Sequence, residues 1–280
     1  MTRPLRRLRA VWGRLTLEAE EVAARLRPPK HRFFVVTAAH QAEGEIERCL
    51  SSVARQRYPS QLVEHLVFDD ASTDATSARV EGFIADHPTR GVELVTNVDN
   101  RGGCANLTEG FRRAPPGSIV LQVDGDDALS DPGVFSFLNH LYASPRVWMT
   151  YNTWRFFDGS PSPQCAPIPR EALRKRRLRD LGWVSSHLHS FRAELFAHVD
   201  EQDMIDPSTG DYWRASVDLA QYLPMLEMAG PRARHLDRIT YLYNLHEGSL
   251  FNARRHEQVE AEKRIRSKRP YPRLRRLEQL

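Results

Sequence analysis

Short apolar runs and longer amphipathic stretches alternate along the first half of the chain. The apolar runs, rich in β-branched and aromatic residues, predict buried strands at 33–37, 64–68, 92–96 and 119–123. The stretches between them place apolar residues at helical spacing and predict helices at 45–56, 74–86 and 105–113. Strands separated by single helices form mostly parallel sheets through right-handed crossovers. The pattern therefore predicts an α/β domain.

The second half of the chain has a less regular pattern. We expect a helix over 134–142, a strand over 148–157 and a proline-rich loop over 158–169. Six basic side chains crowd residues 170–179, which fits either a solvated helix face or a clamp for phosphate groups. A last core helix is predicted over 218–229, because a Gly-Pro pair follows it.

Polar loops follow three of the predicted strands, at 37–41, 69–74 and 124–127. The carboxyl ends of parallel strands meet at one edge, where open α/β sheets bind their ligands. Asp124, Asp126 and Asp127 crowd the last loop, and such close carboxylates repel one another unless a cation lies between them. Two interpretations fit: an ordinary polar turn, or a site for a Mg²⁺-type ion completed by substrate phosphates.

Composition narrows the class of protein. The chain has 280 residues, of which 41% are hydrophobic and 27% charged, as in soluble globular proteins with a sizeable core. No apolar run reaches the ~20 residues of a bilayer span, and no secretory signal pattern is present. Cys49, Cys104 and Cys165 are too far apart for a disulfide framework or a zinc motif. We therefore expect a cytoplasmic protein.

Positive charge is concentrated at the two ends of the chain. Residues 1–32 hold nine Lys/Arg against three Glu, and residues 253–280 hold ten against four, which leaves the region between them at −8 within a total of +4. Residues 5–26 predict an amphipathic helix. Such ends fit solvated helices, a nucleic-acid contact or a peripheral contact with an anionic membrane surface. We expect no nucleic-acid partner, because the body is acidic and carries no nucleic-acid-binding motif.

Two common nucleotide-binding motifs are missing, since neither G-x-G-x-x-G after the first strand nor G-x-x-x-x-G-K-[ST] occurs. The chain instead has a strand ending at Thr37, then "QRYP" at 56–59, "VFDDASTDAT" at 67–76, "NRGG" at 100–103 and "DGDD" at 124–127. In this order and spacing, these segments resemble the nucleotide-sugar-binding half of family 2 glycosyltransferases of the GT-A fold.

The resemblance implies a Rossmann-like, mostly parallel sheet flanked by helices, with a smaller mixed region on the acceptor side and helical basic termini. It also implies an organisation along the chain. A basic amphipathic helix and linker would cover 1–30, the nucleotide-sugar-binding half 31–130, the acceptor-side catalytic half of the same domain 131–252, and a basic C-terminal helix and tail 253–280.

The resemblance assigns donor-side roles to residues of three loops. Thr37, Ala38 and Ala39 would contact the base. Asp70 would accept a hydrogen bond from the base N3–H, and Asn100 and Arg101 would belong to the donor-binding loop. Asp124 would lie near the ribose beside Gly125. Asp126 would hold the Mn²⁺ or Mg²⁺ that bridges the diphosphate, and Asp127 is a further candidate there.

This sequence departs from the family pattern on the donor side. The family's Pro-x-Tyr-Asn after the first strand is here Thr37-Ala38-Ala39-His40, so a base-stacking tyrosine is absent. The family's Ala-Arg-Asn is here Cys104-Ala105-Asn106, and Arg101 is the candidate to replace the missing arginine.

On the acceptor side, Asp218 resembles the catalytic base that opens a helix, with Asp211 as the second candidate. The other interpretation of Asp218 is a carboxylate that the helix dipole favours. His187 and His189 would face one side of a strand; as a zinc pair they lack a third ligand, and an active-site wall is preferred for one of them. His246 resembles the histidine of the family's "Y-R-x-H-x-x-S" segment, which lies by the diphosphate and metal.

The resemblance implies an inverting, metal-dependent glycosyltransferase. It would move a hexosyl or N-acetylhexosaminyl group from a nucleoside-diphosphate sugar, first of all a UDP-sugar, to a hydroxyl of a glycan or lipid-linked acceptor in bacterial surface polysaccharide biosynthesis. Two other classes remain. A nucleotidyltransferase would need basic residues after the first strand, and 37–44 has none. A non-catalytic sugar-nucleotide or glycan-binding protein would not need Asp124, Asp126 and Asp218 together.

Overall fold

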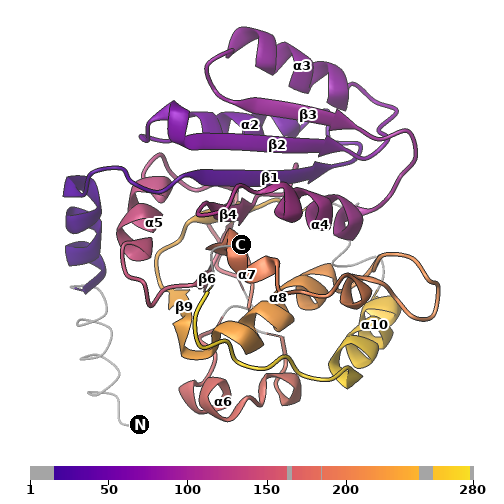
Figure 1. The fold of residues 1–280 in the computed structure, drawn as a ribbon. Coiled ribbons are helices and arrows are strands. Elements are labelled where there is room, and N and C mark those ends of the chain that lie inside the picture. Colours follow the sequence, from indigo (N-terminus) through magenta and orange to yellow (C-terminus); the bar gives the residue numbers. More distant parts are fainter. Residues whose placement is uncertain (1–15, 163–165, 184, 246–254, 278–280) are drawn as a thin grey trace.

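The computed structural model describes residues 16–162, 166–183, 185–245 and 255–277 (Figure 1). Within these ranges the central sheet has seven strands in the order β3-β2-β1-β4-β8-β6-β9. The strands are β1 (Phe33–Ala39), β2 (Val63–Asp69), β3 (Val92–Thr96), β4 (Ile119–Gln122), β6 (Met149–Asn152), β8 (Ser190–Arg192) and β9 (Ala233–Leu236). The mostly parallel α/β sheet expected from the sequence is confirmed.

The strand directions bring three loops to one edge of the sheet. β3, β2, β1 and β4 run parallel, β8 runs antiparallel to both β4 and β6, and β9 runs parallel to β6. Ala39 at the end of β1 pairs with Asp69 at the end of β2, and Val36 pairs with Gln122 at the end of β4. The polar loops after β1, β2 and β4 therefore meet.

A second, three-stranded sheet has the order β5-β10-β7. Its strands are β5 (Ala128–Leu129), β7 (Arg155–Phe156) and β10 (Tyr241–Tyr243). The single strand predicted over 148–157 was wrong, because β6 and β7 belong to different sheets. The strand that would place His187 and His189 on one side does not include them, because β8 begins at Ser190 and α7 (Ala193–Phe196) follows it directly.

Helices cover both faces of the central sheet, and the alternation along β1 separates their cores. Phe33 and Val35 pack with the helices α2 (Ile46–Ala54), α3 (Thr76–Asp86) and α5 (Val134–Tyr142). Phe34 and Val36 pack with α4 (Gly103–Arg113), α8 (Val217–Ala229) and α10 (Arg255–Ser267). This period of two is the expected geometry of a strand buried on both faces.

The remaining helices are short. They are α6 (Arg170–Lys175) and the 3₁₀ turns at Ser60–Leu62, Leu178–Asp180, Glu201–Met204 and Gly230–Arg232. Of the helix predicted over 5–26, residues 16–26 are described and are helical. None of the helices in the described part of the chain has both the length and the hydropathy that a bilayer span requires.

The basic C-terminal segment packs on the body. Ala261 and Ile265 of α10 are buried in the core beside α8. Beyond α10, the Tyr271 N–H donates to Glu227 Oε2 at 2.9 Å and the Leu274 N–H donates to Met228 O at 3.1 Å. Within the described residues 255–277 of the predicted C-terminal helix and tail, apolar side chains of α10 and the backbone N–H groups of Tyr271 and Leu274 therefore find partners on the body.

Arg179 joins this segment to α8 through a buried ion pair. Its guanidinium binds both oxygens of Glu227, at 2.7 and 3.0 Å, and the two side chains are 11% and 0% exposed. Arg179 Nη1 also donates to Ile265 O and Lys268 O, each at 2.7 Å. Four donor contacts satisfy the charge that burial would otherwise make costly.

We expect Arg179→Met to lower the free energy of unfolding by about 3 kcal/mol or more, because Glu227 would be left buried without a cation. Chemical denaturation measures the change. The matched control is Lys175→Met, which removes the 2.7 Å pair with Glu171 between side chains 55% and 66% exposed and should cost less than about 1 kcal/mol. Equal effects of the two substitutions would contradict a structural role for the buried pair.

Candidate active site

The acidic loop after β4 is attached to the end of β1. The Val123 N–H donates to Val36 O at 3.1 Å and the Gly125 N–H donates to Ala38 O at 3.2 Å. A Cβ on Gly125 would lie 2.7 Å from the Ala39 Cβ, so no side chain fits between loop and strand. These contacts extend the parallel pairing of β1 and β4 by three residues and fix where the carboxylates point.

Thr37 supports this loop from inside. Its side chain is fully buried, and its hydroxyl donates to Val123 O at 2.7 Å and lies 2.8 Å from His65 Nε2. The structure therefore places the Thr37 side chain in the core beneath the loop, and not at the open edge with Ala38. Burial lowers the pKa of His65 to about 3, so the ring is neutral.

The carboxylates of the loop differ in their surroundings. Asp127 is buried and its Oδ1 accepts a hydrogen bond from the Asn244 N–H at 2.7 Å. Burial, and after it the charges of Asp126 and Asp124, raises the pKa of Asp127 well above its ordinary value. Asp126 is partly exposed, and its backbone carbonyl accepts a hydrogen bond from Arg48 Nη2 at 3.0 Å. Negative charge in this loop is thus crowded and poorly solvated.

Asp124 is held at the open edge by two neighbours. Its Oδ1 accepts a hydrogen bond from Gln122 Nε2 at 2.7 Å, and its backbone N–H donates to the Tyr241 hydroxyl at 3.1 Å. Burial raises the pKa of Asp124 and the Asp218 charge adds to that rise, while His187 and the Gln122 hydrogen bond oppose it. The carboxylates of Asp124 and Asp218 are therefore close enough to repel each other electrostatically.

Asp218 reaches the same place from the second half of the chain. It lies in the first turn of α8, directly after Ser216-Val217, and Ser216 has a positive φ of 53° that turns the chain into the helix. His187 Nε2 lies 3.6 Å from Asp218 Oδ2 and 4.0 Å from Asp124 Oδ2. Both carboxylate side chains are 30% exposed, whereas the His187 side chain is 9% exposed. The three residues form one cluster with the acids at its open side.

Asp70 organises the next loop along the edge. Its Oδ1 accepts hydrogen bonds from Asn97 Nδ2 and the Arg101 N–H, each at 2.8 Å, and its Oδ2 accepts one from the Gly102 N–H at 2.7 Å. Burial raises the pKa of Asp70, but hydrogen bonds to the carboxylate outweigh it and hold the pKa below its usual value. Asp70 is 3% exposed, so its structural work is to fix loop 97–102.

Arg214 joins this loop to the second half of the chain. Its Nη1 donates to Asn100 Oδ1 at 2.7 Å and its Nη2 donates to Asn100 O at 3.0 Å. Asn100 in turn donates to Asp70 O at 3.2 Å. Arg101, the candidate for a donor contact, is exposed and binds Glu109 at 2.7 Å.

Three further predicted residues are buried behind the cluster, exposed away from it or outside the described ranges, and the first of them, His189, contacts the His187 ring with centroids 5.9 Å apart. His189 is fully buried, stacked on Tyr222 with ring centroids 3.6 Å apart, and its Nε2 lies 2.9 Å from Ser185 Oγ. Burial lowers the pKa of His189 well below its ordinary value. Asp211 is exposed in the loop before α8, where its carbonyl accepts a hydrogen bond from the Asp206 N–H. His246 lies outside the described residues.

Sequence reasoning missed the aromatic and amide groups that hold the acids. Tyr241 and Tyr243 stack on the His187 ring, and Gln122 links Asp124 to the Tyr222 hydroxyl. The sequence does contain a signal for these groups. Gln122 interrupts an apolar strand, and Tyr241 and Tyr243, two residues apart, lie on the same side of β10.

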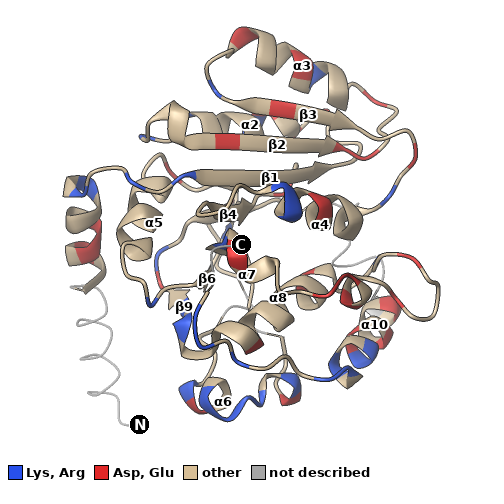
Figure 2. Cartoon of the chain, viewed as in Figure 1, with Lys and Arg blue, Asp and Glu red and all other residues tan. Residues whose placement is uncertain are grey.

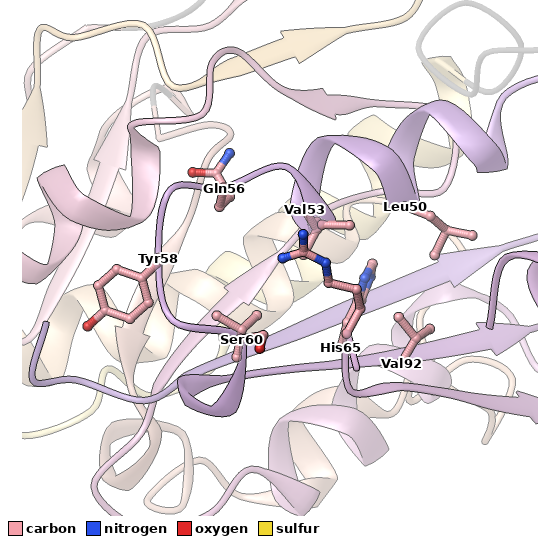
Figure 3. A pocket seen from close by; sticks show the side chains of 10 residues that line it. Leu50, Val53, Gln56, Tyr58, Ser60, His65 and Val92 are labelled. Carbon is pink, nitrogen blue, oxygen red and sulfur yellow. The ribbon is translucent and has the colours of Figure 1, made fainter. Parts of the chain in front are cut away.

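The cavity drawn in Figure 3 is elsewhere. It lies at the amino-terminal ends of β2 and β3, opposite the acidic edge, and Leu50, Val53 and Val92 are among its lining residues. Its volume of about 10 Å³ holds at most one water molecule. Among the residues that the structure describes, no group of three His, Cys, Asp or Glu side chains is placed to bind a metal ion.

Comparison with known proteins identifies the family. The family model described as "Glycosyl transferase family 2" matches residues 34–199, more than half of the chain. The chain belongs to glycosyl transferase family 2. This confirms the resemblance drawn from the sequence motifs. The acidic loop after β4 and His187 lie within the matched residues, whereas Asp218 of α8 lies beyond them.

Curated and solved relatives agree with this membership. The poly(ribitol-phosphate) beta-N-acetylglucosaminyltransferase TarS of Staphylococcus aureus (strain Mu50 / ATCC 700699) is 31% identical over 99 residues, which is 35% of this chain and 17% of TarS. The crystal structure of S. aureus TarS 1-349 with UDP-GlcNAc has a TM-score of 0.62 at 20% identity, over 84% of this chain and 65% of that one.

A second glycosyltransferase shows the same fold. The mannosyltransferase PcManGT from Pyrobaculum calidifontis, in complex with GDP-Man and Mn²⁺, has a TM-score of 0.60 at 20% identity, over 93% of this chain and 74% of that one. The GT-A fold is therefore confirmed. The chain spans only a part of the TarS proteins that it resembles.

Gly125→Ala should destabilise the protein by about 1–3 kcal/mol, because a methyl group 2.7 Å from the Ala39 Cβ forces the acidic loop away from β1. Urea denaturation measures this. Gly44→Ala is the control, since a Cβ there meets nothing within 4 Å. If both variants unfolded at the wild-type urea concentration, the tight contact between loop and strand would not exist in solution.

Proposed function

We propose that this protein transfers a sugar from a nucleoside-diphosphate sugar to a hydroxyl of an acceptor, with inversion at the anomeric carbon. The observation that supports this most strongly is the meeting of Asp124 and Asp218 at His187, 4.0 and 3.6 Å from its Nε2. It brings the end of β4, on the donor side of the fold, next to the start of α8. A reacting pair placed between them would contact both halves of the domain.

Asp218 is suited to be the general base. It is partly exposed in the first turn of α8, on the open side of the cluster. Asp218 would accept the proton of the acceptor hydroxyl as that oxygen attacks the anomeric carbon, on the face away from the leaving diphosphate. A general base of this kind supplies about 10²–10⁴-fold in rate. Asp211 is the weaker candidate, because it lies in an exposed loop.

The residues after β4 fit a divalent cation. Their oxygens are the donors that Mg²⁺ and Mn²⁺ prefer, and substrate phosphates usually complete such a shell. Burial and mutual repulsion raise the pKa of Asp127 well above its ordinary value, a strain that a cation would relieve. Asp126 would hold the ion, with His246 as the second candidate ligand and Asp127 as a further one. When bound, the ion neutralises the charge that develops on the departing diphosphate.

The donor is proposed to be a UDP-sugar, with UDP-N-acetylglucosamine as the first to test. The support is the likeness to TarS, whose structure was determined with UDP-GlcNAc. A hydroxyl of a glycan or lipid-linked acceptor in bacterial surface polysaccharide synthesis is the proposed second substrate. Ala38, which is partly exposed, and the loop held by Asp70, which includes the exposed Asn100 and Arg101, are the parts of the edge available to the nucleotide; Ala39 is buried against Gly125. Release of nucleoside diphosphate would separate this activity from nucleotidyl transfer, which releases pyrophosphate, and from binding alone.

Asp218→Asn should lower kcat for transfer by about 10²–10⁴-fold while donor binding stays within a few-fold of wild type. Product formation and titration calorimetry with UDP-N-acetylglucosamine measure the two quantities. Asp211→Asn is the matched control and should keep wild-type kcat. Near-normal transfer by Asp218→Asn, or its loss in Asp211→Asn, would disprove the assignment of the base.

Asp126→Ala should abolish the dependence of donor binding on Mn²⁺, because it removes the carboxylate that would hold the ion. Thermal shifts with UDP-sugar, each measured with Mn²⁺ and with a chelator, give the comparison. A wild-type protein whose donor-induced shift ignores Mn²⁺ would argue against a metal in this reaction.

We also propose a peripheral contact with an anionic membrane surface through the basic side of the second half. Lysines and arginines gather on α6 and α10 (Figure 2). Arg174 of α6 is exposed, as are Arg269 and Arg275 in the segment that follows α10. Acidic lipids attract such residues by about 1 kcal/mol each.

The triple variant Arg174→Glu, Arg269→Glu and Arg275→Glu should lose co-sedimentation with phosphatidylserine-containing liposomes, and wild-type binding should fade as salt rises. Pure phosphatidylcholine liposomes are the control. Equal binding of both proteins would place any membrane contact elsewhere.

A further inference from the structure

His187 lies between the two carboxylates of the proposed active site, and its ring is the deepest part of the cluster. The side chain is 9% exposed, against 30% for each of Asp124 and Asp218. Its backbone lies in the segment before β8, so the residue comes from neither the β4 loop nor α8. The fold therefore inserts a third element between donor side and acceptor side.

Aromatic stacking fixes the orientation of the ring. His187 lies nearly parallel to Tyr241, with ring centroids 5.0 Å apart and an angle of 15°, and to Tyr243 at 6.0 Å and 26°. The Tyr241 hydroxyl accepts the hydrogen bond from the Asp124 N–H. The platform that orients the imidazole is thus the same one that holds Asp124.

The two ring nitrogens have different surroundings. Nε2 faces both carboxylates, whereas Nδ1 is buried without a hydrogen-bond partner in the described structure. A protonated Nε2 is attracted to both carboxylates, whereas the lone pair of an unprotonated Nε2 would repel them, so we assign the proton to Nε2. His187 therefore presents an Nε2–H donor to the site whichever charge the ring has.

The distance to Asp218 Oδ2 is slightly longer than a hydrogen bond, at 3.6 Å. Catalytic hydrogen bonds are often long without substrate and shorten in the reacting complex. Such a bond would occupy Oδ2 of Asp218 and leave Oδ1 for the proton of the acceptor hydroxyl. It would also place a donor between two carboxylates that otherwise repel each other.

We propose that His187 is a positioning residue that orients the Asp218 carboxylate toward the acceptor hydroxyl and shields it from Asp124. This inference rests on the proposed function, in which Asp218 is the base. Because misplacement of a reacting group by about 1 Å costs about 10²-fold in rate, the effect belongs in kcat and not in donor affinity.

Two substitutions of His187 separate the role of its N–H group from the role of its aromatic ring. His187→Phe keeps an aromatic ring against Tyr241 and Tyr243 but removes the N–H. His187→Gln loses the ring and restores an N–H donor of similar reach. We expect His187→Phe to lower kcat about 10²-fold with the donor KM and donor-induced thermal shift within threefold, and His187→Gln to recover at least tenfold of that loss.

His235→Phe is the matched control. That histidine also packs on a tyrosine, Tyr151, with ring centroids 5.3 Å apart, and its Nδ1 lies 3.4 Å from Asp237 Oδ1. It lies on β9, outside the cluster of Asp124, Asp218 and His187, and the variant should keep kcat within threefold. Loss of rate in both Phe variants would show a packing effect and overturn the proposal. A wild-type kcat in His187→Phe, equal losses in the Phe and Gln variants, or a raised donor KM at unchanged kcat would overturn it as well.

A spectroscopic measurement on the full chain does not depend on activity. In ¹⁵N-labelled protein, assigned through His187→Phe, the Nε2 signal of His187 should show a bonded proton and should shift in Asp218→Asn but not in Asp237→Asn. An unprotonated Nε2, or a signal that ignores Asp218→Asn, overturns the positioning role. If no nucleotide sugar is bound or turned over by the wild-type protein, the proposed function fails, while the NMR result still decides whether His187 positions Asp218.

Discussion

Electrostatic repulsion among carboxylates at the carboxyl edge of the sheet constrains everything built around it. Asp124, Asp126 and Asp127 follow one strand within four residues, and α8 adds Asp218 from the other half of the chain. Burial makes this charge more costly, as the raised pKa values of Asp124 and Asp127 show. Neighbouring hydrogen-bond donors stabilise these carboxylates. Asn244 gives a backbone N–H to Asp127, Gln122 gives an amide to Asp124, and His187 faces both Asp124 and Asp218.

The alternation of apolar and polar residues was enough to predict the parallel part of the fold. Four apolar strands separated by helices leave few ways to order a parallel sheet, and the acids at their ends had to meet. The same alternation predicts the burial of Thr37, because it shares a side of β1 with Phe33 and Val35. Family resemblance gave Thr37 a role at the base. The alternation of side chains along the strand explains why the Thr37 side chain is buried, with its hydroxyl donating to Val123 O under the acidic loop.

What the sequence could not supply were contacts between residues far apart in the chain. The partners of Asp70 are backbone N–H groups of loop 97–102, which depend on the positive φ of 84° at Gly102. His187 and Asp218 come together only because β8 runs antiparallel to β4 and α8 begins beside it. Charge counts were equally uninformative for the C-terminal segment. Arginine also donates to carbonyl oxygens, and Arg273 and Arg232 hold the chain itself in this way, at Leu173 O and Leu274 O.

One helix connects the two extremes of this architecture. α8 carries Asp218 in its first turn and Glu227 near its last, and Glu227 is held by Arg179 and by the backbone of Tyr271. Residues 271–274 therefore help to hold the helix that carries the proposed base, although they lie more than 50 residues after Asp218 in the sequence. For anyone who engineers this protein, the consequence is practical. Deleting residues 255–277 would remove the contacts that anchor α8, and would therefore change the scaffold that carries Asp218.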